Sequence, residues 1–197
     1  MTDLIPSVQL PSGKSGPWTV EKFTVTEDGA AMHNLRAMLN RHRGETMIYP
    51  GEYTRLLRGG TIIMSDTPGE KQDHETFVRY AAGKVLIAGL GLGMVTNAVL
   101  LKPNVKHVTV VEIDSDVIKL VGPHLPNQER LEVVNADIWE WKPRRGARYS
   151  DAWFDIWPDI CEDNLDEMQA LKKRFRTYCK HMGFWSENRF RVVNALY

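Results

Sequence analysis

Apolar and polar residues follow different periods along this chain, and the changes divide it into three zones. Residues 1–17 are rich in proline, glycine and serine and show no periodicity, so we predict a flexible N-terminal arm. Residues 18–75 carry short alternating runs and one helical pattern, which indicates a small α+β region. In residues 76–197 apolar strand patterns alternate with helical ones, which is typical of a mostly parallel sheet with crossover helices. The predicted fold class is α/β.

The small N-terminal region is predicted to hold a strand, a helix and a β hairpin. The strand covers Trp18 to Thr26, and the helix runs from Glu27 or Asp28 to about His42. Two further strands, Tyr53 to Leu57 and Thr61 to Met64, flank a turn with two glycines and therefore predict a hairpin. The apolar stripe of the predicted helix consists of Met32, Leu35, Met38 and Leu39.

The rest of the chain is predicted to form five strands of one sheet. The first is the apolar run Val85 to Ala88, which has the length and β-branched content of a buried parallel strand. A long helix ended by Gly183 is predicted between the last two strands, from about Asn164 to His181. The other four predicted strands are His107 to Ile113, Leu131 to Val134, about Ala152 to Ile156, and Phe184 to Val193.

Three glycines directly after the first of these strands are the strongest indication of a binding site. Gly89, Gly91 and Gly93 open a helical segment, so that strand, tight turn and helix follow in order. The next strand brings Glu112 to its end, about twenty residues beyond the turn, where a carboxylate can accept hydrogen bonds from both hydroxyls of a ribose. The glycines could serve only the turn itself, and Asp114 is a rival acid that also suits the N-cap of the following helix.

The ligand can be narrowed by what the turn lacks. The dinucleotide fingerprint G-x-G-x-x-G needs a third glycine where this chain has Met94, which disfavours NAD. A G-x-x-x-x-G-K-[ST] loop, which would wrap nucleotide phosphates, is also missing. A nucleoside without phosphates fits better, and S-adenosylmethionine is the commonest cofactor of that kind.

These residues resemble the class I S-adenosylmethionine-dependent methyltransferases, and within that fold the spermidine synthases most closely. The resemblance covers about Leu57 to Asp159 and implies a Rossmann-like sheet whose glycine motif, ribose acid Glu112 and adenine-binding segment Asn135 to Ile138 bind the cofactor. Asp155 falls where these families place a residue facing the reacting sulfonium. The predicted cofactor contacts are Gly89, Leu90, Gly91, Gly93, Glu112, Ile113, Asp137, Ile138 and Asp155.

Asp155 and Asp159 are the predicted catalytic residues. A carboxylate at the end of the fourth strand can orient an amine and attract its proton, although Asp155 could also merely cap a loop, as Asp137 could cap a turn. The stretch Leu57 to Asp66, with His74 and Glu75 after it, is similar to the spermidine synthase lead-in. His74 and Glu75 could approach the methionine end of the cofactor, or both could be solvated helix residues.

The acceptor stays open because the chain departs from both family patterns. Leu92 stands where spermidine synthases usually carry Asp in the glycine turn, and residues 155–159 match neither their Asp-Ser-Ser-Asp-like run nor the Asn-Pro-Pro-Tyr of amide and base-amine methyltransferases. Few residues follow Asp155, so the antiparallel strand pair that usually completes the fold is expected to be missing. The exposed sheet edge would then need a cover or a partner chain in a homo-oligomer.

Composition restricts the classes of partner. Acidic and basic residues balance at 25 each among 197, which argues against a dominant nucleic-acid footprint. Cys161 and Cys179 lack metal-ligand spacing, so we expect reduced thiols, no metal site and a cytoplasmic protein. No apolar run approaches about 18 residues and no signal pattern begins the chain, so a membrane span is not expected.

The leading hypothesis is an S-adenosylmethionine-dependent methyltransferase with a small-molecule or protein acceptor. The enzymatic alternative is aminopropyl transfer from decarboxylated S-adenosylmethionine to a diamine, suggested by the stretch Leu57 to Glu75. The third hypothesis is a non-catalytic module that keeps the fold and binds a partner.

Overall fold

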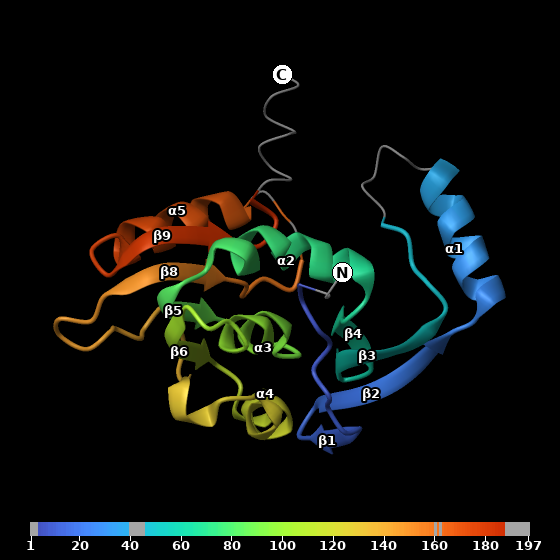
Figure 1. Ribbon diagram of the computed structural model, residues 1–197, viewed down its shortest axis with the longest axis horizontal. Coiled ribbons are helices and arrows are strands. Elements are labelled where there is room, and N and C mark those ends of the chain that lie inside the picture. Colours follow the sequence, from blue (N-terminus) through green and yellow to red (C-terminus); the bar gives the residue numbers. More distant parts are fainter. Residues whose placement is uncertain (1–3, 40–45, 160, 162, 188–197) are drawn as a thin grey trace.

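The computed structural model describes residues 4–39, 46–159, 161 and 163–187, which form two sheets packed against each other (Figure 1). The front sheet is antiparallel in the order β1-β2-β3-β4. Helix α1 (Glu27–Leu39) leaves this sheet after its second strand. The strands are β1 (Gly13–Ser15), β2 (Trp18–Val25), β3 (Gly51–Arg58) and β4 (Thr61–Ser65), so the predicted strand and hairpin are confirmed.

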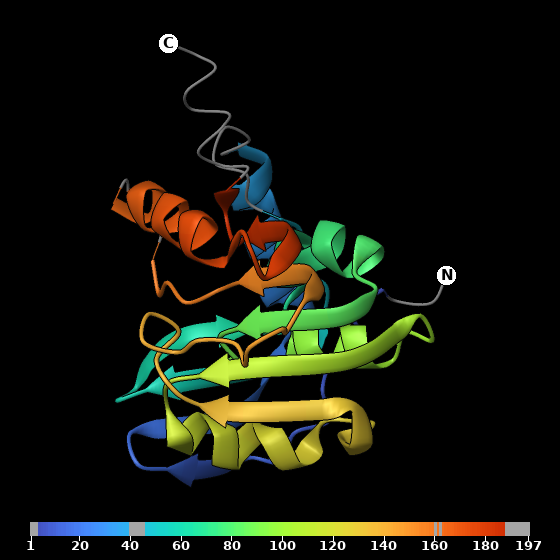
Figure 2. The ribbon, with the colours of Figure 1, turned by 90° about the vertical axis from the view of Figure 1, so that its left-hand side faces the viewer.

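The second sheet is entirely parallel, in the order β7-β6-β5-β8-β9 (Figure 2). Its strands are β5 (Gly83–Ala88), β6 (Val105–Glu112), β7 (Leu131–Asn135), β8 (Tyr149–Phe154) and β9 (Cys179–Phe184). The accompanying helices are α2 (Pro68–Tyr80), α3 (Met94–Leu100), α4 (Ser115–Val121) and α5 (Asp163–Phe175), with short 3-10 turns η2 (Gly122–His124) and η3 (Gln128–Arg130). The predicted α/β class with a mostly parallel sheet and crossover helices is confirmed.

Both faces of the parallel sheet are covered, because side chains of β5 alternate between two hydrophobic clusters. Val85 and Ile87 pack in the cluster that also holds the α3 and α4 side chains. Leu86 and Ala88 pack in the other cluster with Phe175 and the rest of the apolar face of α5. Helices α2, α3 and α4 therefore lie on one face and α5 on the opposite face (Figure 1).

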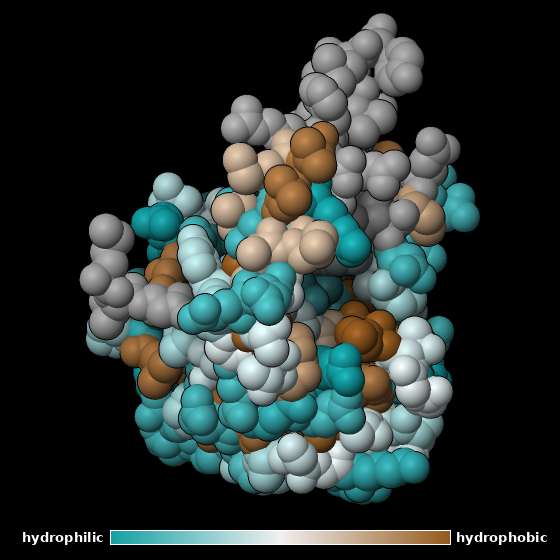
Figure 3. Space-filling model, turned by 90° about the vertical axis from the view of Figure 1, so that its right-hand side faces the viewer, coloured by the Kyte–Doolittle hydropathy of each residue, from teal (hydrophilic) through white to brown (hydrophobic). Residues whose placement is uncertain are grey.

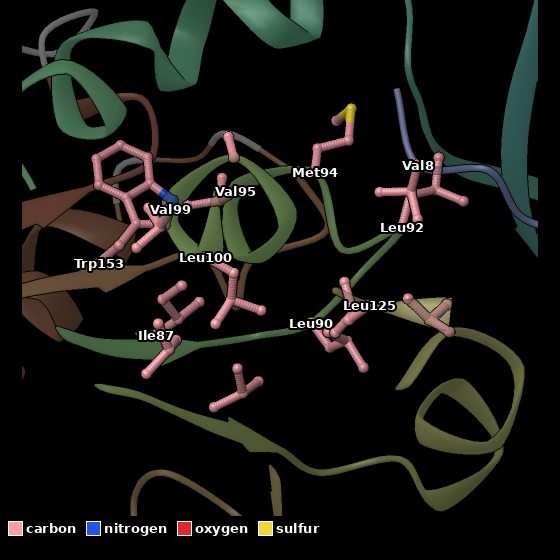
Figure 4. Close-up of a cluster of buried hydrophobic side chains, with 14 of the residues drawn as sticks. Val8, Ile87, Leu90, Leu92, Met94, Val95, Val99, Leu100, Leu125 and Trp153 are labelled. Atoms are coloured by element: carbon pink, nitrogen blue, oxygen red, sulfur yellow. The ribbon is translucent and has the colours of Figure 1, made fainter. Parts of the chain in front are cut away.

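The prediction of a flexible N-terminal arm is wrong for the described residues from 4 onward. Ile5, Val8 and Leu10 are buried in the cluster of α3 and α4, and Figure 4 places Val8 in that cluster close to Leu92. Irregular spacing hid these residues, because they pack into a core shared by the front sheet and helices α3 and α4 rather than along one face of a local element. Helix α2 also spans the predicted boundary between residues 75 and 76, so the front region and the parallel sheet share one core.

Two predicted boundaries near the C-terminus are also wrong. The helix predicted to reach His181 ends at Phe175, and the fifth strand is Cys179–Phe184 rather than a strand that starts at Phe184. Gly183 lies inside this strand, where a Cβ atom would meet the ring of Trp153 at 2.9 Å, so the residue makes room for an aromatic ring instead of ending a helix. Residues 188–193 of the predicted strand lie outside the described part of the chain.

Helix α1 forms where the sequence predicted it, but its predicted apolar stripe does not face the core. Its buried side chains are Ala30 and Ala37, whereas the four predicted stripe residues are exposed. The pattern predicted the helix correctly because period is local, but which side faces the protein depends on distant contacts. Residues 40–42 of the predicted helix fall outside the described residues.

Candidate active site

The topology brings the carboxyl ends of β5, β6 and β8 together at one edge of the parallel sheet. Open parallel sheets bind ligands at this edge, where the strand order reverses beside the first strand. A cavity of about 690 Å³ lies there, within the range typical of small-molecule sites. The front sheet closes it from the other side, since Trp18, Leu56 and Met64 line the cavity together with Gly89 and Gly91.

The glycine turn lies tightly between neighbouring segments. Gly89 and Gly91 have φ angles of +91° and +51°, which side-chain-bearing residues rarely adopt. A Cβ atom on Gly89 would lie 2.0 Å from the backbone oxygen of Asp155, and one on Gly91 would lie 2.3 Å from Sδ of Met64. The sulfur of Met64 also accepts a hydrogen bond from the Leu92 amide at 3.1 Å. The cradle therefore needs glycine at both positions.

Glu112 lies directly against this turn. One carboxylate oxygen accepts a hydrogen bond from the Leu90 amide at 2.7 Å, and the other accepts one from the Asp114 amide at 2.8 Å. Burial raises the pKa of this carboxyl, and these backbone hydrogen bonds oppose the rise. Because a carboxylate has about four acceptor positions, each oxygen keeps capacity for a further donor such as a ribose hydroxyl.

The rival acid Asp114 is committed elsewhere. Its side chain caps α4 by accepting a hydrogen bond from the Asp116 amide, and it also accepts one from Nε1 of Trp18 at 2.6 Å. This contact ties β2 of the front sheet to the rim of the cavity. The geometry favours Glu112 over Asp114 for ribose, and the ribose contact itself stays a prediction.

Within the predicted adenine-binding segment, Ala136, Asp137 and Ile138 line the cavity, whereas the side chain of Asn135 binds the backbone oxygens of Glu112 and Ile113. Ile113 is exposed and Ile138 is buried, and each adds an apolar wall. The side chain of Asp137 accepts a hydrogen bond from the Trp139 amide at 2.8 Å, so it does cap the turn that follows β7. Capping occupies one of its oxygens, which leaves the other for an adenine amino group.

The opposite end of the cavity is acidic. Burial, and then the negative charges of Glu70 and Asp73, raise the pKa of Asp155 to about 7. Nε2 of His74 lies 3.8 Å from Asp155 Oδ2, too far for a hydrogen bond. Burial lowers the pKa of this histidine to about 4, so His74 is neutral near pH 7. Among the described residues, Nδ1 of His74 has no hydrogen-bond partner.

Glu70 and Met64 are cavity residues that the sequence analysis missed. Glu70 lies one turn before His74 on α2, so both face the cavity. The amide and hydroxyl of Ser65 donate hydrogen bonds to Glu70 at 2.8 and 2.9 Å, and burial raises the pKa of its carboxyl. The spacing of Glu70 and His74 along one helix face was the signal that could have found it.

Some predicted site residues do not reach the cavity. Asp159 is exposed and is absent from the cavity lining, and its backbone oxygen accepts a hydrogen bond from Asn164 at the start of α5. Glu75 is exposed and lies 4.0 Å from Arg79. The turn residues Leu90 and Gly93 contribute backbone: the Leu90 side chain is in the core, and Gly93 caps α3 against Val121. The bend after β8 therefore directs Asp155, and not Asp159, to the cavity.

The comparisons with known proteins agree with this geometry. Among solved structures, the protein SMU.776, named as a methyltransferase and solved in complex with SAH, is similar to this chain. The TM-score is 0.50 and the identity 14%, and the match covers 85% of this chain and 41% of SMU.776. The chain has the class I S-adenosylmethionine-dependent methyltransferase fold. Residues 81–167 of this methyltransferase-fold chain match the family model "Ribosomal RNA adenine dimethylase".

Curated proteins with similar sequences are named as aminopropyltransferases rather than methyltransferases. Polyamine aminopropyltransferase 1 of Streptomyces coelicolor is 29% identical over 131 residues, 60% of this chain and 24% of that protein. Polyamine aminopropyltransferase 2 of Caldanaerobacter subterraneus is 35% identical over 82 residues, 39% of this chain and 28% of that protein. The chain thus spans about a quarter of the length of these relatives. No helix in the described ranges is both long and apolar enough to cross a membrane.

Proposed function

We propose that this chain is a cytoplasmic S-adenosylmethionine-dependent methyltransferase. One observation carries the proposal: the glycine turn lies between two acids, with Glu112 hydrogen-bonded to the Leu90 amide on one side and the Asp155 backbone against Gly89 on the other. The first acid can hold a ribose diol while the second faces the reacting end of the same ligand. The match of residues 81–167 to a methyltransferase family model and the fold both support this cofactor.

The residues present fit such a cofactor. Gly89 and Gly91 leave the backbone open to close approach by a ligand. The Glu112 carboxylate accepts the Leu90 and Asp114 amide hydrogens and carries negative charge, so it suits a sugar hydroxyl and would repel a phosphate. When bound, S-adenosylmethionine supplies an electrophilic methyl carbon and a neutral thioether as leaving group. The protein needs to position the acceptor in line with that carbon and to take up one proton.

Asp155 is the group that takes up the proton. Its pKa of about 7 makes it an effective base near neutrality, because a base is most useful when its pKa lies close to the working pH. Asp155 would orient an acceptor amine toward the methyl carbon and would accept the proton that the nitrogen releases on methylation. Neutral His74 can accept a hydrogen bond from the same amine.

An amine is the acceptor class that the acidic end of the cavity favours. Glu70 and Asp155 concentrate negative charge there, which attracts a cationic ammonium group before it loses its proton. A small-molecule amine or a protein side chain would satisfy this charge. A nucleic-acid acceptor has support from the description of the matched family model, but the run Asp155 to Asp159 lacks the Asn-Pro-Pro-Tyr pattern that acts on base amines.

Aminopropyl transfer is the second candidate. The names of the curated relatives favour it, and so does an acidic cavity end that suits a diamine. The two activities differ in their cofactor, because aminopropyl transfer uses the decarboxylated form. Among the described strands, β9 pairs only with β8, so its other edge is open. The predicted homo-oligomer through an exposed sheet edge is a separate proposal that this open edge supports.

Calorimetry with S-adenosylmethionine, its decarboxylated form and S-adenosylhomocysteine tests the proposal. We expect the carboxylated cofactor to bind more tightly, and mass spectrometry with a mixed pool of amines, proteins and RNA to find products heavier by one methyl group. Tighter binding of the decarboxylated cofactor with aminopropylated products would replace the proposal by the second candidate. Binding without any product would leave a non-catalytic module.

Asp155→Asn and Asp159→Asn form a matched pair for the same assay. Both replace a carboxylate within the same bend, but only the first removes a group that lines the cavity. Asp155→Asn should keep cofactor binding and lose about 100-fold or more in turnover, the usual contribution of a general base. Asp159→Asn should match the wild type, and equal losses in both would contradict the assignment.

A further inference from the structure

Helix α1 presents an apolar stripe to solvent. Met32, Leu35, Met38 and Leu39 are 54% to 77% exposed, and Ala31 beside them is exposed too. Figure 3 shows apolar side chains gathered on the upper part of this face, where α1 lies. Stripes with a helical period normally face a core, and contiguous apolar surface on a protein commonly marks a contact site. The stripe therefore needs an occupant.

The outward orientation of the stripe is fixed by the other side of the helix. The side chain of Asn34 donates a hydrogen bond to the Ile48 backbone oxygen at 2.9 Å and accepts one from the Ile48 amide at 2.8 Å. Ala30 and Ala37 are buried beneath the helix on the same side. Rolling the stripe inward would break both hydrogen bonds and expose both alanines, so the stripe faces outward in the folded chain.

The spacing of the stripe matches a copy of itself. Ala31, Met32, Leu35, Met38 and Leu39 lie at positions −4, −3, 0, +3 and +4 relative to Leu35. Two such helices packed antiparallel about a two-fold axis at Leu35 bring Leu35 against Leu35 and Met32 against Met38. The same axis pairs small Ala31 with large Leu39. A two-fold interface requires this kind of self-complementary surface.

We propose that the stripe is covered by α1 of a second copy of this chain, antiparallel about a two-fold axis at Leu35. Charge supports the antiparallel direction. Glu27 and Asp28 occupy the first turn of the helix. A parallel pair would stack the two acidic turns on each other, whereas the antiparallel pair places them at opposite ends and also opposes the helix dipoles.

The contact extends beyond the helix by the segment that Asn34 holds. Met47 and Tyr49 flank Ile48, and they are 43% and 64% exposed. One helix and this short segment make a small contact, so we expect reversible dimerisation with a dissociation constant in the micromolar range.

Sedimentation velocity of the full chain tests the dimer. Between about 1 µM and about 300 µM the wild type should pass from monomer to dimer. Leu35→Lys should stay monomeric throughout, because two lysines would meet at the axis. Leu101→Lys is the matched control, since Leu101, the C-cap residue of α3, is 53% exposed and Leu35 is 54% exposed. It should dimerise like the wild type.

A charge exchange identifies the partner as a second copy. Leu35→Lys and Leu35→Glu should each be monomeric alone, and an equimolar mixture should recover dimers because only opposite charges then meet at the axis. Circular dichroism confirms that each variant is folded. A wild-type chain that is monomeric at all concentrations, a dimeric Leu35→Lys variant, or a mixture that stays monomeric would each overturn the proposal.

Discussion

Glu112→Gln is the most informative substitution, because its effect on the ribose contact and its effect on the turn appear in different measurements. In the folded chain both carboxylate oxygens already accept backbone hydrogen bonds, from the Leu90 and Asp114 amides. A glutamine amide has only one oxygen, so its NH₂ group must face one of these amide donors. The variant therefore loses an acceptor toward the turn and one toward the ribose at the same time.

The expected loss of affinity follows from this count. A hydrogen bond from a hydroxyl to a charged acceptor contributes about 1.5–3 kcal/mol, so we expect S-adenosylmethionine to bind about 10- to 150-fold more weakly. The lost turn contact should lower the unfolding free energy of the free protein by about 1–2 kcal/mol, since one buried donor loses its partner. Calorimetry measures the first effect and thermal unfolding measures the second.

Asp114→Asn is the control because Asp114 is the rival acid on the same cavity rim. Its side chain binds Trp18 and the Asp116 amide, so its loss should weaken cofactor binding by no more than about threefold. Affinity that is unchanged in Glu112→Gln, or that falls only in Asp114→Asn, would refute the assignment of the ribose acid. Loss of binding in both variants together with unfolding would point to a purely structural role for the turn.

Three further predictions follow from buried contacts. Ile5→Ala should lower the unfolding free energy by about 2–5 kcal/mol in chemical denaturation, because Ile5 is fully buried in the core. Gly89→Ala should cost about 3 kcal/mol or more in the same measurement, since its Cβ atom would clash with the Asp155 backbone oxygen in addition to the strain of a positive φ angle. Activity should rise with pH through about 7 as Asp155 ionises, and Glu70→Gln should move this limb about 0.5–1 pH unit lower, because removing a nearby negative charge lowers the pKa of Asp155.

Each of these three predictions can be checked against a control variant or a contradicting outcome. Gly146→Ala keeps the positive φ angle, at +82°, but meets no atom within 4 Å, so it should cost only about 1–2 kcal/mol. Gln9→Ala changes an exposed residue of the segment that holds Ile5 and should be nearly neutral. Equal costs for the two glycines would contradict the clash, and a limb that does not move in Glu70→Gln would remove Asp155 or Glu70 from the titration.

Local pattern was sufficient for most of the fold. The strand, glycine turn and helix from Gly83 to Leu100 were predicted because the apolar run, the turn chemistry and the helical period all lie within eighteen residues. β9 was misplaced because its sequence, Cys179–Phe184, has no β-branched residue and no clear alternation. Its place in the sheet depends on pairing with β8 and on the Trp153 ring above Gly183, neither of which a local pattern contains.

The cavity also has one part that local sequence pattern predicts and another part that it does not. Its cofactor end consists of residues that directly follow strands, and strand ends are recognisable in sequence. Its other walls come from far away along the chain: Trp18 and Met64 belong to the front sheet, and Glu70 belongs to α2. The local pattern does not bring Trp18 to the glycine turn, because its hydrogen bond to Asp114 joins residues 96 positions apart. Met64 and Glu70 lie in a stretch that the sequence linked to the site only through its resemblance to spermidine synthases.

Helix α2 explains how these two halves become one site. Its first half carries Glu70 and His74 to the cavity, and its second half buries Val78 in the core shared with the parallel sheet. The position of Glu70 is set from the front sheet, because Ser65 at the end of β4 donates two hydrogen bonds to it. The front sheet therefore fixes where the charge of Glu70 lies, and this charge adds to the effect of burial in raising the pKa of Asp155. Within β4, cofactor binding and acid–base behaviour depend on different residues, because Met64 lies against the glycine turn and Ser65 holds Glu70. Ser65→Ala should therefore change the pH dependence of activity and leave cofactor affinity unchanged.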